Sequence, residues 1–402
     1  MNNKKITCLL TLILSAIMMM SMLVSCNNEV VNNGEQSDNN QVATDDMFDF
    51  SELDISTVSY FKPEGEQTGY IENNGEKIVP EYVLKINGIP VSIEEYRYPY
   101  LNEKFRLDGG DDTLWTEEAA EENRLTAEDA ETVKNNTVNY LKQTMIFQFL
   151  AAKYNVSLSE EEIKQVDDLM QSTRDSFNAE DSDYTYEEAL NESYLTDAYL
   201  RYGNLNASLS NKVFSAFYID ENAPLKFSAE QAVQYLKDSD YIRAQHILIK
   251  FPDEPTEGTE EEIAAAVAQN KADTLKKAEE VLEKVNAGED FMTLVEQYNE
   301  DPGMGIYGED GYYFTKGVMV EEFENAAYAL EEGATSGLVE TSFGYHIIKR
   351  LPLEADYILE NAATYLVPAY SSDFTDKINS GVESLTIEYA PEYELITPST
   401  LF

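Results

Sequence analysis

The chain has 402 residues, with 76 acidic and 28 basic side chains, so its formal net charge at neutral pH is −48. A negative field of this size repels nucleic acid and anionic lipid surfaces, and it therefore excludes nucleic acid as a partner. The field also attracts cationic partners, but general solvation explains the composition more simply than specific recruitment of basic clients.

The N-terminus has the pattern of a secretory signal: two lysines, an apolar run from Ile6 to Val24, and then Ser25-Cys26. The run is also about long enough for a transmembrane anchor. However, Leu-Val-Ser before Cys26 resembles the bacterial lipoprotein box. This resemblance implies a signal peptide over residues 1–25, a lipid on Cys26, and an extracytoplasmic protein anchored to the cell membrane. Because Cys8 would be removed, we expect neither a disulfide nor a metal site.

Residues 26–79 are predicted to form an acidic, Asn-rich tether. Residues 27–41 have almost nothing to bury, so they should stay disordered. The pattern is ambiguous from there to Val79, because apolar residues that could form a short strand pair are interrupted by Gly and Glu. These apolar residues are Phe48, Phe50, Leu53, Ile55, Tyr60 and Phe61.

Residues 80–240 are predicted to be mainly helical. Asn87-Gly88 favours a hairpin turn, because both positions of this turn type require positive φ. Ser92 with Glu95, Ser159 with Glu162, and Ser228 with Gln231 have the spacing of capping boxes that begin helices. Apolar residues at helical spacing follow, through Val138 to Leu150, Ile163 to Met170, Leu190 to Tyr202, and Ala232 to Leu236.

Two apolar, β-branched stretches predict strands at the two ends of residues 241–352. They run from Ile242 to Lys250 and from Phe343 to Lys349, and each contains one of the two histidines of the chain, His246 and His346. A lone histidine in such a strand is usually a hydrogen-bonded core residue. Two histidines in matching strand contexts favour a shared site. Between them, helical spacing predicts a long helix that ends at Gly288 and a short one from Phe291 to Tyr298.

Four motifs in this segment resemble the parvulin-type peptidyl-prolyl isomerases. They are Ala244-Gln245-His246-Ile247-Leu248-Ile249, Tyr298-Asn299-Glu300-Asp301-Pro302-Gly303, Gly317-Val318-Met319-Val320-Glu321-Glu322-Phe323 and Thr341-Ser342-Phe343-Gly344-Tyr345-His346-Ile347-Ile348. The resemblance implies a small antiparallel-rich sheet flanked by helices over residues 241–352. With the helical region before it, the expected fold class is α+β.

Prolyl isomerisation breaks no bond, and its barrier of about 18–20 kcal/mol is the double-bond character of the amide. A site needs an apolar slot for the proline ring and a polar patch beside the rotating carbonyl. By resemblance, Met319, Phe323 and Phe343 would form the slot. The polar patch would be His246, Asp301, Thr341 and His346, with Asp301 weakening the amide resonance and no cofactor required. Without the resemblance, Met and Phe four residues apart are more often core.

The segment departs from the family in two loops. Residues 251–262 carry six carboxylates and no Lys or Arg, whereas phosphate-directed parvulins have a basic cluster there, so no phosphopeptide preference is expected. The family's Gly-Gly-Asp-Leu-Gly turn resembles Tyr307-Gly308-Glu309-Asp310-Gly311. A tyrosine at a positive φ would cost energy or change the loop, and Asp310 would wet the rim of the pocket.

The order of hairpin, amphipathic helices and isomerase resembles the extracytoplasmic foldases of the PrsA and SurA type. This implies a chaperone-like domain at 80–240, a C-terminal segment at 353–402 that packs back on it, and unfolded secreted polypeptides with X-Pro bonds as clients. A plain helical packing domain remains possible. The main function predicted is isomerase and foldase, and the alternative is a catalytically silent, client-holding chaperone. A solute-binding lipoprotein is disfavoured, because repeated βα units are missing.

Overall fold

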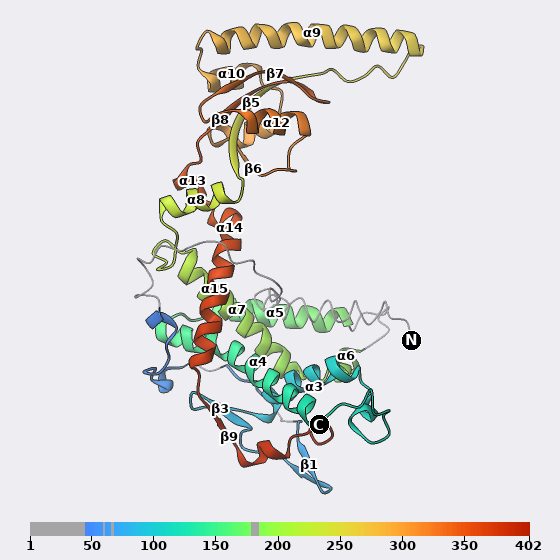
Figure 1. Ribbon diagram of the computed structural model, residues 1–402, viewed down its shortest axis with the longest axis vertical. Helices are drawn as coiled ribbons and strands as arrows, with labels where there is room; N and C mark the ends of the chain where they lie inside the picture. Colours follow the sequence, from blue (N-terminus) through green and yellow to red (C-terminus); the bar gives the residue numbers. More distant parts are fainter. Residues whose placement is uncertain (1–44, 59–60, 66–67, 178–184) are drawn as a thin grey trace. The chain divides into compact units, whose positions relative to one another are not determined.

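The computed structural model describes residues 45–58, 61–65, 68–177 and 185–402 (Figure 1). The predicted signal peptide, Cys26 and the tether as far as residue 44 lie outside the described residues. Chain contacts divide the protein into two compact units. The first contains residues up to Lys226 and from Tyr370 to Phe402, and the second contains Phe227–Ala369. Among the described helices, none is both long enough and apolar enough to span a bilayer.

The described part of the first unit is mainly helical. Its helices are α3 (Ile93–Asp108), α4 (Ala127–Tyr154), α5 (Glu160–Phe177), α6 (Tyr186–Glu192), α7 (Asp197–Tyr218) and, from Tyr370 on, α15 (Val367–Ser384), with 3-10 helices η1 (Asp45–Phe48), η2 (Ile55–Thr57), η3 (Asp112–Trp115) and η5 (Pro391–Leu395). Strand β1 (Ile71–Asn73) pairs with β2 (Glu76–Ile78), and β3 (Leu84–Ile86) lies between β4 (Ile89–Val91) and β9 (Ile387–Tyr389).

The turn and cap predictions for the helical region are confirmed. Asn87 and Gly88 have φ of 45° and 83° and join β3 to the antiparallel β4. Ser92 caps α3 in a reciprocal box with Glu95. The boxes of Ser159 with Glu162 and of Ser228 with Gln231 are also present. These side chains satisfy backbone N–H groups that the first helical turn leaves without a partner.

The prediction of a tether as far as residue 79 is wrong for the described residues after 44. Phe48 and Phe50 are buried, and their rings pack on Phe217 and Phe149 at centroid distances of 6.0 and 5.8 Å. The strand pair also forms at other residues than expected. Strands β1 and β2 lie on either side of the turn at residues 74–75, after the apolar residues between Phe48 and Phe61. Two buried aromatic rings supply enough apolar area to order a segment that its composition alone would leave mobile.

The predicted helix through residues 190–202 is interrupted. Helix α6 ends at Glu192, Tyr194 has a positive φ of 57°, and α7 begins after its cap Thr196. Leu190, Leu195, Tyr199 and Tyr202 nevertheless belong to one core cluster. The break preserves the apolar face, so helical spacing alone does not reveal it.

The second unit is built on a four-stranded antiparallel sheet in the order β6-β5-β8-β7. The strands are β5 (Ile242–Lys250), β6 (Tyr312–Phe314), β7 (Thr335–Glu340) and β8 (Gly344–Leu351). The helices are α8 (Ala229–Asp238), α9 (Glu260–Asn286), α10 (Phe291–Tyr298), α11 (Pro302–Tyr307), α12 (Glu321–Ala329), α13 (Ala355–Glu360) and α14 (Ala362–Tyr365), with 3-10 helix η4 (Gly308–Asp310). The predicted α+β class, helices with small antiparallel sheets, is confirmed.

Strand alternation assigns the two faces of this sheet to different helices. Ile247 and Ile249 of β5 pack in one cluster with residues of α9 and α10, whereas Ile242 and Ala244 pack in another with residues of α12. Figure 1 shows α9 and α10 on one side of the sheet and α12 on the other. His246 has the parity of Ala244, so it lies on the α12 face.

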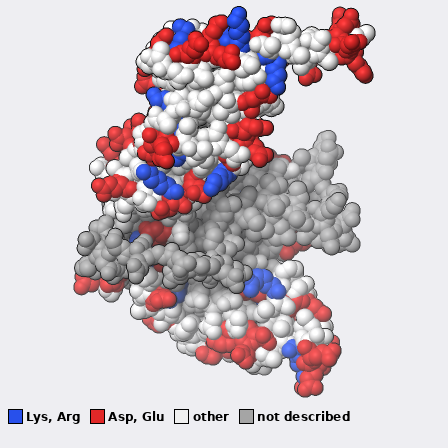
Figure 2. Space-filling view, turned by 45° about the horizontal axis from the view of Figure 1, so that its top comes forward, with Lys and Arg blue, Asp and Glu red and all other residues white. Residues whose placement is uncertain are grey.

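Acidic side chains are spread over the visible surface of both units rather than gathered in one patch (Figure 2). This distribution agrees with general solvation of the protein by its carboxylates.

Candidate active site

The two histidines are diagonal neighbours on the α12 face of the sheet. In the β5–β8 register, His246 is opposite Ile348, and Leu248 is opposite His346. Two residues offset by two positions on adjacent strands come within reach of each other on the same face. Both side chains are buried, at 6% and 4% exposure. The sheet register therefore brings together two rings that are about a hundred residues apart in sequence.

A continuous chain of hydrogen bonds links the four predicted polar residues. His246 Nε2 lies 2.8 Å from Asp301 Oδ2, and the Nδ1 atoms of the two histidines are 3.4 Å apart. At the other end, His346 Nε2 lies 2.9 Å from Thr341 Oγ1, which accepts the backbone N–H of Phe343 at 3.1 Å. The structure thus places His246, Asp301, Thr341 and His346 in one connected network.

When both imidazoles are neutral, a single direction of proton donation satisfies every hydrogen bond of this network. His246 then donates from Nε2 to the carboxylate of Asp301, and its Nδ1 accepts from Nδ1 of His346. Nε2 of His346 in turn accepts the hydroxyl proton of Thr341. Every ring nitrogen has a role in this arrangement, so the network fixes both tautomers.

The surroundings keep Asp301 ionised. The hydrogen bond from His246 is the largest cause that lowers the pKa of its carboxyl well below the usual range. Tyr312 Oη donates to the same oxygen at 2.7 Å, and the N–H of Gly303 donates to the other at 3.1 Å. Burial acts in the opposite direction but is outweighed. A negative charge is therefore held at the open end of the network at neutral pH.

His346 is kept neutral by its burial. Desolvation, and then the nearby His246, lower its pKa to about 4. The ring can therefore act as a fixed hydrogen-bonding group near neutral pH, but not as a cation.

Phe323 forms the apolar floor beside the network. Its ring is 3% exposed and meets those of His246 and His346 nearly edge-on, at centroid distances of 5.1 and 5.3 Å. Met319 packs, partly buried, against the same cluster. Phe343 is 53% exposed, and its backbone N–H joins the network. Of the three predicted slot residues, Met319 and Phe323 therefore lie together, while Phe343 is largely exposed.

Tyr312 is a member of the network that the sequence analysis did not identify. It is the first residue of β6, and its hydroxyl shares the Asp301 oxygen with His246. Its ring also lies 5.6 Å from that of His246. Its sequence position carried no signal of this role, because Tyr312 reaches Asp301 across a turn.

The strain expected at Tyr307 is absent. Tyr307 has a φ of −83°, and the positive φ values of the turn, 53° and 66°, belong to Gly308 and Gly311. Buried Arg243 holds the turn by donating to the carbonyls of Glu309 and Asp310 at 2.9 and 2.6 Å. The expectation of a costly backbone is therefore wrong, because the turn takes its left-handed positions at its glycines.

The ring of Tyr307 does not extend into the core. It is 43% exposed and lies 5.0 Å from the ring of Tyr312. It therefore covers the outer side of the tyrosine that contacts Asp301, while the ring of Phe323 packs against the histidines.

Parts of the chain are similar in sequence to known proteins. Residues 227–351 match the family of the PPIC-type PPIASE domain. The chain is 34% identical to the foldase protein PrsA 4 of Bacillus cereus over 223 residues, which is 52% of this chain and 61% of that protein. It is 40% identical to the foldase protein PrsA of Geobacillus sp. over 126 residues, which is 31% of this chain and 37% of that protein. The matched regions thus span less than two thirds of these relatives.

The chain is also similar to proteins of solved structure. The solution structure of TbPIN1 is 31% identical, with 28% of this chain and 98% of that chain covered and a TM-score of 0.23. The crystal structure of PrsA from Bacillus subtilis is 22% identical, with 63% and 84% covered and a TM-score of 0.24. In sequence, residues 227–351 thus match the PPIC-type PPIASE domain family, and about half of the chain is similar to a PrsA foldase protein.

Proposed function

We propose that this protein is a peptidyl-prolyl cis-trans isomerase and foldase for secreted polypeptides, held at the outer face of the cell membrane by a lipid on Cys26. The observation that carries the isomerase part is the network from Thr341 through both histidines to an ionised Asp301, with Phe323 beside it. The match of residues 227–351 to the PPIC-type PPIASE domain family supports the same reaction.

The geometry suggests how the barrier is lowered. The proline ring would pack on Phe323 and Met319, which removes the amide from water, and the less solvated amide loses part of the stabilisation of its charge-separated form. The planar amide also carries partial negative charge on its oxygen. The fixed charge of Asp301 beside that oxygen disfavours the planar state relative to the twisted one. No proton transfer or covalent bond is required.

The surface around the site suits an extended chain. Within the described residues of the second unit, the exposed large apolar side chains lie in three segments that adjoin the network. These side chains are Ile306, Tyr307, Val318, Val320 and Phe343. Exposed apolar residues gathered in this way are typical of a binding surface, and here they would hold residues on either side of the proline.

Isomerisation of a proline tetrapeptide and proline-limited refolding of a model client test this proposal. We expect the wild type to accelerate both, and His246→Ala to reduce kcat/KM at least tenfold with an unchanged far-ultraviolet spectrum. A wild type that binds the client and prevents its aggregation, yet leaves both rates unchanged, would establish the alternative function, a client-holding chaperone without isomerase activity.

The foldase part rests on kinship with the PrsA foldases and on the first unit. This unit has its own core and exposes Phe105 and Leu107 at 52% and 40%. Full-length His246→Ala separates the two activities, because it should still suppress client aggregation. If suppression disappears together with isomerisation, the first unit is only a packing domain.

The lipid anchor on Cys26 and the absence of a phosphopeptide preference are tested separately. Cys26→Ser should move the protein from the membrane fraction to the medium, and an unchanged distribution would exclude the lipid anchor. The carboxylate-rich loop after β5 should also give no preference for phosphoserine before proline over serine, since like charges repel.

A further inference from the structure

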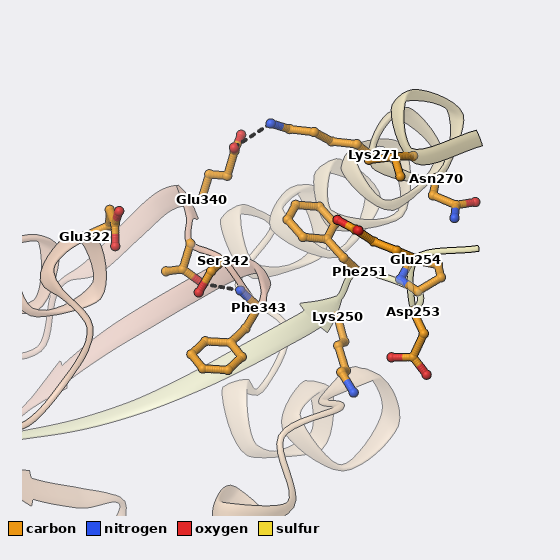
Figure 3. A pocket seen from close by; sticks show the side chains of 13 residues that line it. Lys250, Phe251, Asp253, Glu254, Asn270, Lys271, Glu322, Glu340, Ser342 and Phe343 are labelled. Atoms are coloured by element: carbon orange, nitrogen blue, oxygen red, sulfur yellow. Dashed lines mark hydrogen bonds and ion pairs between the residues drawn. The ribbon is translucent and has the colours of Figure 1, made fainter. Parts of the chain in front are cut away.

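A pocket of about 560 Å³ lies beside the catalytic network in the second unit. Its walls come from the end of β5 and the loop after it, from α9, and from the turn between β7 and β8 (Figure 3). The mechanism described above does not use this space.

The pocket is continuous with the site through Thr341. This residue lines the pocket and also forms the hydrogen bond to His346 Nε2. The carbonyl that rotates during isomerisation belongs to the residue before the proline. Because this carbonyl must lie along the network, the side chain of the same residue is the one that can enter the pocket.

The charge of the pocket is negative. Asp253 and Glu254 lie on the loop after β5, and Glu322 lies across the pocket on α12 (Figure 3). Glu340 is neutralised by Lys271 at 2.6 Å. Within the described residues, the three other carboxylates and Lys250 have no ion-pair partner, so the unpaired groups carry three negative charges against one positive.

The pocket also has apolar walls. Phe251, Val267 and Phe343 line it, and the ring of Phe251 is fixed against Tyr345 at a centroid distance of 5.3 Å. A long aliphatic stem with a cationic end fits such a lining, because its methylene groups pack on the rings while its charge reaches the carboxylates.

We propose that this pocket binds the side chain of a lysine or arginine that precedes the isomerised proline, and so makes basic-residue–proline bonds the preferred substrates. The proposal rests on the proposed isomerase function and deepens it. Specificity here comes from Asp253, Glu254 and Glu322.

The test uses the full-length protein and Ala-Xaa-Pro-Phe peptides in which Xaa is Lys, Leu or Glu. Both kcat/KM and the dissociation constant of a fluorescent version of each peptide are measured at low and high salt. We expect the Lys peptide to be favoured over the Glu peptide by about five- to tenfold at low ionic strength, with Leu in between, and the ratio to shrink in high salt.

Charge-neutral variants assign the effect to the pocket. The triple variant Asp253→Asn, Glu254→Gln and Glu322→Gln should lower the Lys/Glu ratio below about twofold. Glu280→Gln, on the second half of α9, removes one exposed carboxylate outside the pocket and should leave the ratio unchanged. All four positions are exposed, so folding should not be affected.

The outcomes separate the two proposals. Equal turnover of all peptides, or a preference for Glu through Lys250, overturns the pocket proposal while isomerase function stands. If no peptide is isomerised, the proposed function fails, and the dissociation constants still decide the pocket. A Lys/Glu affinity ratio that the triple variant abolishes supports the proposal, and a ratio of one or less overturns it.

Discussion

The Nδ1 atoms of His246 and His346 face each other at 3.4 Å. Two neutral rings in this position share a single proton between these atoms, and two cations would repel each other at close range. The network therefore depends on His346 remaining neutral, which its burial ensures.

This dependence predicts how stability changes with pH. The pKa of His346 is about 4 in the folded protein and close to its ordinary value of 6.5 when unfolded. Between pH 6.5 and 4 the unfolded chain thus binds more protons at this residue, and the free energy of unfolding falls as pH decreases. The loss should approach about 3 kcal/mol at pH 4, as read from hydrogen exchange of residues 227–369.

His346→Asn provides the matched comparison, because it keeps every carboxylate that titrates in the same range. Its stability is expected to be lower at pH 7 but to fall less steeply below pH 6.5. Parallel pH profiles for the variant and the wild type would show that the imidazole is not the group responsible.

Tyr312→Phe should impair catalysis without changing the fold. The substitution removes one of the two hydrogen bonds to Asp301 Oδ2, so the pKa of that carboxyl should rise. We expect kcat/KM for peptide isomerisation to fall by about threefold to tenfold, with its acid limb displaced to higher pH. Asp301→Ala should cause a larger loss.

Tyr313→Phe is the control for this substitution. Tyr313 adjoins Tyr312 in β6, but its hydroxyl accepts the N–H of Glu354 and its ring stacks on Tyr357. It should leave the pH profile of activity unchanged. An equal effect of both substitutions would mean that Tyr312 acts only through the packing of β6.

Gly344→Ala should unfold the start of β8. Gly344 has a φ of 154°, and a Cβ there would lie 2.1 Å from the backbone oxygen of Ile249. The backbone on both sides is fixed by the β5–β8 ladder, so the clash cannot relax cheaply. We expect a loss of about 3 kcal/mol or more in the free energy of unfolding. Gly337→Ala in β7 meets no atom within 4 Å and should change stability by less than about 0.5 kcal/mol.

Much of the site was predictable because its residues lie in short, ordered motifs. His246 and His346 were placed by two apolar, β-branched stretches that form paired strands, and Phe323 by the resemblance of its motif to the parvulin family. The roles of Tyr312 and Arg243 were not predictable from spacing. Tyr312 reaches Asp301 across a turn, and Arg243 contacts backbone carbonyls that any sequence provides.

The fold predictions failed where distant contacts outweigh local pattern. Phe48 and Phe50 order a polar segment only because Phe217 and Phe149 lie beside them. The break at Tyr194 is hidden because both flanking helices present apolar residues to the same core. In each case the deciding partner is remote in sequence, which local propensity cannot register.

The first unit contains a buried ion pair that has an exposed counterpart at the same spacing. Lys104 and Asp108 on α3 pair at 2.7 Å with side chains 10% and 0% exposed, whereas Lys164 and Asp168 on α5 pair with both more than 60% exposed. Asp108 also accepts the indole N–H of Trp115 at 2.8 Å. Asp108→Ala removes the acceptor of the Trp115 indole and leaves Lys104 with Asp112 as its other carboxylate partner, so it should cost about 2 kcal/mol. Asp168→Ala should cost no more than about 0.5 kcal/mol. Urea denaturation followed by the fluorescence of the single tryptophan measures both, and equal losses would mean that water reaches Asp108 as readily as Asp168.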